Sequence, residues 1–141
     1  MKKGLLLLIV LFCLTGCNKN YSELTSTKFL SEFTGKDYTI IDHSYETENF
    51  FDKNIEVGKK NVNFYYVIYK TEKEAKEFME EKYKNNKNYK YVQKGKTIIA
   101  TDQGIKEYTR IIKVNKTILV AKSNGLFAKL KLKQELNNLG Y

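Results

Sequence analysis

The chain has 141 residues, with 25 basic and 16 acidic side chains that give a formal charge of +9, and 42% of its residues are hydrophobic. This composition excludes a disordered chain, and the length suits one compact domain without room for several. Two cysteines and a single histidine are too few for a disulfide framework or an ordinary zinc site, so we expect no metal and no cofactor.

The first sixteen residues have the layout of an export signal. Lys2 and Lys3 precede an uncharged apolar run from Leu5 to Leu14. A helix of ten residues spans only about 15 Å, roughly half the hydrocarbon thickness of a bilayer, so a signal core fits better than a spanning helix.

The stretch Leu14-Thr15-Gly16-Cys17 resembles the lipobox of bacterial lipoproteins, in which an aliphatic and two small residues precede an obligatory cysteine. The resemblance implies cleavage between Gly16 and Cys17 and a diacylglyceryl group on the Cys17 thiol. Cleavage would remove Cys13, so no free thiol would remain. The alternative is an ordinary secretory signal with an unrelated cysteine. We expect a signal peptide over residues 1–16, a lipidated tether over 17–24 and one domain over 25–141. This predicts a protein held on the extracytoplasmic face of the cell membrane by its covalent lipid.

Local signals predict the elements of the first half of the domain. Thr25, Ser26 or Thr27 can cap a short helix that ends at Gly35. A strand is expected around residues 38–45, whereas residues 49–57 are ambiguous. The residues GKKN (58–61) predict a turn before the clearest strand, VNFYYVIYK (62–70), in which Val62, Phe64, Tyr66 and Ile68 share one face.

The strongest helix signal follows that strand. Thr71 and Glu74 form a capping box, and the helix places Ala75, Phe78, Met79 and Tyr83 at helical spacing. Glu72–Lys76 and Glu80–Lys84 are expected as favourable pairs four residues apart.

Four strands and a helix are expected in the rest of the chain. The strands are predicted around residues 89–94, 97–101, 105–114 and 117–122. Ser123 is expected to cap a last helix that reaches Leu139, although the alternation in AKLKLK (128–133) also suits a strand.

These elements predict an α+β domain with an antiparallel sheet and two to three helices packed on it. The order from Val62 onward, β-α-β-β-β-β-α, resembles the TATA-binding-protein-like topology, which implies a fold and no function. The plan and the C-terminal Leu139-Gly140-Tyr141 also resemble small exported lipoproteins of Gram-positive bacteria. That resemblance implies no catalytic residues.

The sequence shows little sign of catalysis. His43 lacks a nucleophile in a suitable position, because Ser44 points to the other side of a strand. The acidic residues near it, Asp42, Glu46, Glu48 and Asp52, lack the spacing of a calcium loop, so a solvated loop is expected. No nucleophile-elbow, phosphate-loop or dinucleotide motif occurs. We therefore expect no enzyme, no catalytic residues and no metal ligands.

One segment, residues 82–96, combines lysines and tyrosines without any acidic residue. An exported protein is not expected to meet nucleic acid, so anionic wall polymer, lipid headgroups and an envelope protein stay open as partners. The favoured alternative is a solvated helix end and a lysine-protected edge strand. The candidate surface consists of Lys82, Lys84, Lys87, Lys90, Lys94, Lys96, Tyr89 and Tyr91.

The functional prediction is a membrane-anchored lipoprotein with a non-catalytic binding domain. An accessory subunit of a membrane or cell-envelope complex is the first alternative, and would show an exposed apolar patch. A cell-envelope enzyme is the second alternative, and would show a pocket that joins His43 to carboxylates.

Overall fold

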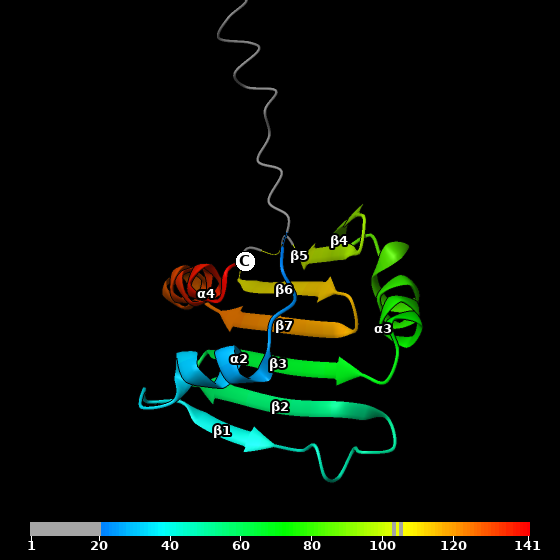
Figure 1. Ribbon diagram of the computed structural model, residues 1–141. Coiled ribbons are helices and arrows are strands. Elements are labelled where there is room, and N and C mark those ends of the chain that lie inside the picture. Colours follow the sequence, from blue (N-terminus) through cyan, green and yellow to red (C-terminus); the bar gives the residue numbers. More distant parts are fainter. Residues whose placement is uncertain (1–20, 103, 105) are drawn as a thin grey trace, which may run out of the picture.

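The computed structural model describes residues 21–102, 104 and 106–141. These residues form one seven-stranded sheet in the order β1-β2-β3-β7-β6-β5-β4, and every neighbouring pair is antiparallel (Figure 1). The strands are β1 (Thr39–Asp42), β2 (Phe51–Lys59), β3 (Val62–Tyr69), β4 (Tyr89–Lys94), β5 (Thr97–Asp102), β6 (Glu107–Val114) and β7 (Thr117–Asn124). The helices are α2 (Ser26–Phe33), α3 (Glu72–Met79), the π-helical turn η1 (Glu80–Lys84) and α4 (Leu126–Leu139). The α+β prediction is confirmed.

The chain crosses the sheet once between distant strands. After β3, the segment α3–η1 carries it to β4 at the far edge, and β5, β6 and β7 then return by hairpins until β7 pairs with β3. The predicted β-α-β(4)-α order from Val62 onward is therefore confirmed. The two free edges of the sheet are β1 and β4.

Helices α2 and α4 cover one face of the sheet, which we call the α2/α4 face. The Thr25 side chain accepts the Lys28 N–H at 3.2 Å and so caps α2, as one of the three predicted caps. Phe29 and Phe33 are fully buried, and Phe29 stacks on Tyr66 with ring centroids 4.8 Å apart. The larger hydrophobic cluster lies between these two helices and the sheet.

Helix α3 packs on the opposite face, which we call the α3 face. The predicted capping box is present, because Thr71 Oγ1 accepts the Glu74 N–H and the Glu74 carboxylate accepts the Thr71 N–H. Ala75 and Met79 are buried there against Ile98, Ala100, Ile111 and Ile118. A second, smaller hydrophobic cluster thus holds α3 on the sheet.

Two local predictions need correction, whereas the helix predicted to reach Leu139 is confirmed over the strand alternative for residues 128–133. Ser123 does not cap α4: it is a strand residue of β7, paired with Val62 and Tyr108, and the helix begins after Gly125. The stretch 128–133 is helical throughout, because Leu132 packs in the larger cluster together with Leu136 and Leu139 one and two turns later. Glu72 contacts Lys113 of β6 rather than Lys76, whereas the Glu80–Lys84 pair is present at 3.5 Å.

The chain before α2 packs on the domain as far as it is described. Leu24 is buried, and the Tyr21 ring lies 5.3 Å from that of Tyr141. Residues 21–24 of the predicted tether are therefore part of the fold. Among the described residues, no helix has the length and apolar character needed to cross a membrane.

Candidate functional site

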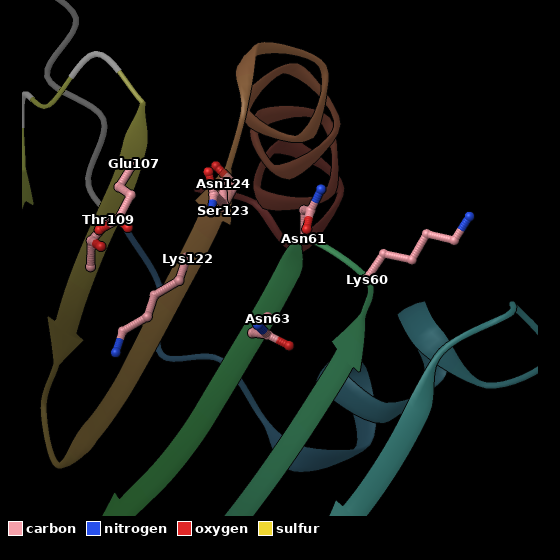
Figure 2. A pocket seen from close by; sticks show the side chains of 8 residues that line it. All are labelled: Lys60, Asn61, Asn63, Glu107, Thr109, Lys122, Ser123 and Asn124. Atoms are coloured by element: carbon pink, nitrogen blue, oxygen red, sulfur yellow. The ribbon is translucent and has the colours of Figure 1, made fainter.

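The α3 face is covered at one end only. Helix α3 packs near the end of β3 and the beginning of β7, where Tyr69 and Ile118 lie in its cluster. At the other end of the same strands, the surface is hollowed into a cavity of about 320 Å³ (Figure 2). It is lined by Lys60, Asn61, Asn63, Glu107, Thr109, Lys122, Ser123 and Asn124.

The strand register brings the polar side chains of this cavity together. Asn63 of β3 and Thr109 of β6 both pair with Lys122 of β7, one on each side. Side chains alternate between faces along a strand, so these three point to the α3 face while Val62 and Phe64 point to the core. Glu107 lies opposite Asn124 at the cavity's outer end.

A glycine in the neighbouring strand gives Asn63 its position. Gly58 of β2 lies opposite Asn63, and a Cβ atom on Gly58 would stand 2.6 Å from Asn63 Oδ1. The missing side chain therefore leaves the space that the Asn63 carboxamide occupies.

The turn at the cavity rim has an unusual backbone. Lys60, between β2 and β3, has φ +46°, in the left-handed region that non-glycine residues rarely adopt. The Asn61 carbonyl accepts the Asn124 N–H at 2.9 Å and ties this turn to the end of β7. Asn115, in the β6–β7 hairpin, has a similar φ of +51°, so this conformation belongs to a tight two-residue turn and does not by itself mark a binding site.

The lining groups can form hydrogen bonds and neutralise negative charge. Three carboxamides and two hydroxyls donate and accept hydrogen bonds, two ammonium groups only donate, and Glu107 provides the one carboxylate. Figure 2 shows the Lys60 and Lys122 side chains extending away from each other, so positive charge lies on two sides of the carboxamides. The Lys122 ammonium also lies 5.5 Å from the centre of the Tyr65 ring. Such a lining suits a ligand with hydroxyl and anionic groups.

The predicted lysine and tyrosine surface is not one surface in the structure. Its six lysines are exposed, but Tyr89 and Tyr91 are only partly exposed and pack against the α3 cluster. Tyr89 lies edge-on to Tyr83 at 4.9 Å. Lys90 and Lys94 alternate with these tyrosines along β4 and so point to the other face. The tyrosines therefore do not form an open groove with those lysines.

His43 and the acidic residues near it lie at the end of β1, away from the cavity lining. The ring nitrogens of His43 lie 3.1 Å from Glu46 and 3.7 Å from Glu56. Asp52 pairs with Lys116 and Lys70, and these two ammonium groups lower the pKa of its carboxyl. No group of three metal-ligating side chains occurs within the described residues.

The remaining predicted site residues, Gly16 and Cys17, lie outside the described residues. None of the cavity residues is among the site residues predicted from the sequence. The available signal was one polar residue in the clearest strand: Asn63 lies between the apolar Val62 and Phe64, on the side of the strand opposite to theirs.

No protein-family model, curated protein or solved structure matches the chain.

Proposed function

We propose that this chain is a lipid-anchored extracytoplasmic protein that binds a phosphate-bearing polyol, such as a short stretch of anionic wall polymer, in the cavity at the end of β7, without transforming it. The observation that carries the proposal is the lining: carboxamides from two segments of the chain line the cavity together with two lysines. Carboxamides bind hydroxyl groups, and lysines bind phosphates as point charges. The anchor rests on the lipobox-like Leu14–Cys17.

Binding is tested with oligomers of glycerol phosphate and the lipid-free chain 18–141, which contains every residue that the structure describes. Lys122→Gln removes a charge-assisted contact and should weaken binding about tenfold in titration calorimetry. Lys87→Gln is the matched control, because it removes the same charge from an exposed loop position away from the cavity. Equal losses in both variants would show that the polymer binds to diffuse positive charge and not to the cavity. Recovery of an altered oligomer by mass spectrometry would contradict a purely binding function.

The anchor has its own test. Cys17→Ala should abolish incorporation of labelled fatty acid and leave an uncleaved precursor or release the protein from the membrane fraction. Cys13→Ala is the control, since that cysteine lies within the signal, and lipidation should persist. Incorporation of label into the Cys17→Ala variant would contradict the lipobox interpretation.

A second function, as an accessory subunit of an envelope complex, is supported by exposed apolar side chains beside the free edge of β1. Tyr45 and Phe50, in the loop after β1, are 86% and 69% exposed, and Ile41 of β1 is 44% exposed. A Tyr45→Ser/Phe50→Ser variant should then lose partners that the intact protein retains in cross-linking from its own membranes. Unchanged cross-links would remove the support for this function.

A further inference from the structure

The first two turns of α4 carry three large apolar side chains that the fold leaves uncovered. Leu126, Phe127 and Leu130 are 69%, 86% and 58% exposed. The buried residues of the helix, such as Leu132 and Leu136, lie on the opposite side, since successive residues turn by about 100°. The three side chains therefore point away from the sheet and form a single outward ridge.

Lysines stand on both sides of this ridge. The ammonium groups of Lys129 and Lys133 lie 4.9 and 5.7 Å from the centre of the Tyr108 ring. Lys131 extends the other way, and its ammonium group lies 5.2 Å from the centre of the Tyr38 ring. The one acidic residue of the helix, Glu135, is buried. The outer side of α4 is therefore apolar along its centre and positive along its margins.

The place where the chain enters the domain lies at the other end of the same helix. The Tyr141 hydroxyl, just after α4, donates a hydrogen bond to the Ser22 carbonyl at 3.2 Å. Figure 1 shows the C-terminus beside the start of the described chain. Tyr21 follows Cys17 by four residues, so a lipid on that cysteine would hold Tyr21 within about 14 Å of the bilayer. Helix α4 is about 21 Å long, and it packs on the sheet face that also holds Tyr21.

We infer that the outer side of α4 docks onto an anionic lipid bilayer. Leu126, Phe127 and Leu130 enter the boundary between headgroups and acyl chains, and the flanking lysines contact the anionic headgroups. A bilayer fits better than a protein groove, because the positive margins lie on both sides of a narrow apolar ridge, which suits a broad negative surface. The inference is independent of the ligand cavity and uses the proposed lipid anchor only to explain how α4 is brought to the membrane.

Docking would orient the whole domain. Helix α4 and the cavity lie on opposite faces of the sheet, so a bilayer against α4 leaves the cavity facing away from the membrane. In an anchored protein, this is the direction of the cell wall.

The test uses the lipid-free chain 18–141 and vesicles of phosphatidylcholine alone or mixed with phosphatidylglycerol. The chain contains no tryptophan, so Phe127→Trp introduces a single fluorescent reporter. Its emission should shift to shorter wavelength with phosphatidylglycerol vesicles. Tyr45→Trp is the matched control, because both native side chains are 86% exposed, and its emission should not shift. No shift in Phe127→Trp, or equal shifts in both variants, would overturn the inference.

A second measurement separates insertion from charge attraction. Leu126→Ser/Phe127→Ser/Leu130→Ser should lower co-sedimentation with phosphatidylglycerol vesicles at least about tenfold, because it removes the buried apolar area and leaves every lysine in place. Circular dichroism checks that this variant is folded, which is expected because the three side chains are exposed. Lys87→Gln, on an exposed loop away from both surfaces, should bind vesicles like the unaltered chain, and the triple variant should keep its affinity for glycerol phosphate oligomers, so failure of the cavity proposal and failure of this inference are distinguishable. Equal sedimentation of the triple variant would overturn docking by α4.

Discussion

Alkaline pH should destabilise this protein, because several tyrosines hold their protons more tightly in the folded chain than in the unfolded chain. Burial is the main cause: it raises the pKa of Tyr38, Tyr69 and Tyr141 to about 12 each. The pKa of Tyr66 is raised further by its burial beneath α2. An unfolded tyrosine has a pKa of about 10.

The sign of the effect follows from proton binding. Below pH 10 both states keep these protons, and stability is unaffected. Between about pH 10 and 12 the unfolded chain loses them first, so it binds fewer protons than the folded chain and stability falls as the pH rises. At pH 11 each tyrosine with a pKa of about 12 should lower the free energy of unfolding by about 1.4 kcal/mol. Because Tyr38 and Tyr69 are partly exposed, we expect these two and Tyr141 to lower it by about 3 kcal/mol together. Domains of this size are stable by about 5–15 kcal/mol, so the loss is a large fraction.

Tyr69→Phe isolates one of these groups. The Tyr69 hydroxyl has no hydrogen-bond partner among the described residues, so the substitution should change the free energy of unfolding little at pH 7. At pH 11 it should make the chain more stable than the unaltered protein by about 1 kcal/mol. Urea unfolding followed by circular dichroism measures both values, and tyrosinate absorbance reports the ionisation directly. Tyr45→Phe, at a position 86% exposed, is the control. A free energy of unfolding that stays constant from pH 8 to pH 11 would refute this reasoning.

Three further substitutions test contacts between neighbouring elements of the fold. Glu72→Gln should lower the free energy of unfolding by about 2 kcal/mol, because the buried Lys113 ammonium would keep only the Lys96 carbonyl as a partner. Lys113→Met removes the buried charge itself, so its free energy of unfolding should stay within about 1 kcal/mol of that of the unaltered chain. Urea unfolding measures both, and equal losses would contradict the asymmetry. Gly58→Ala should displace the Asn63 carboxamide and weaken glycerol phosphate binding, with a change in stability below about 1 kcal/mol. Unchanged affinity would show that Asn63 does not contact the ligand.

Much of the fold could be predicted because its signals are local. A capping box such as Thr71–Glu74 satisfies the first backbone N–H groups of its helix from within one turn, so it is visible in four consecutive residues. Alternation in β3 likewise places Phe64 and Tyr66 on one face and Asn63 and Tyr65 on the other without knowledge of any partner. The export signal and its lipobox are also short and contiguous, and they stay predictions that only chemistry at Cys17 tests.

The sequence by itself determined the α+β class, most of the helices and strands, and the side of β3 that enters the core, whereas β2 stayed ambiguous. Only the tertiary structure decided which of these segments contact one another. Ser123 continues β7 because Val62 and Tyr108 pair with it on either side, and Glu72 turns to Lys113 because the crossover lays α3 over β6. The cavity and the outer ridge of α4 could not be predicted from the sequence for the same reason. The sequence shows the polarity of each side chain, but whether another segment covers that side chain depends on contacts between residues far apart in the chain.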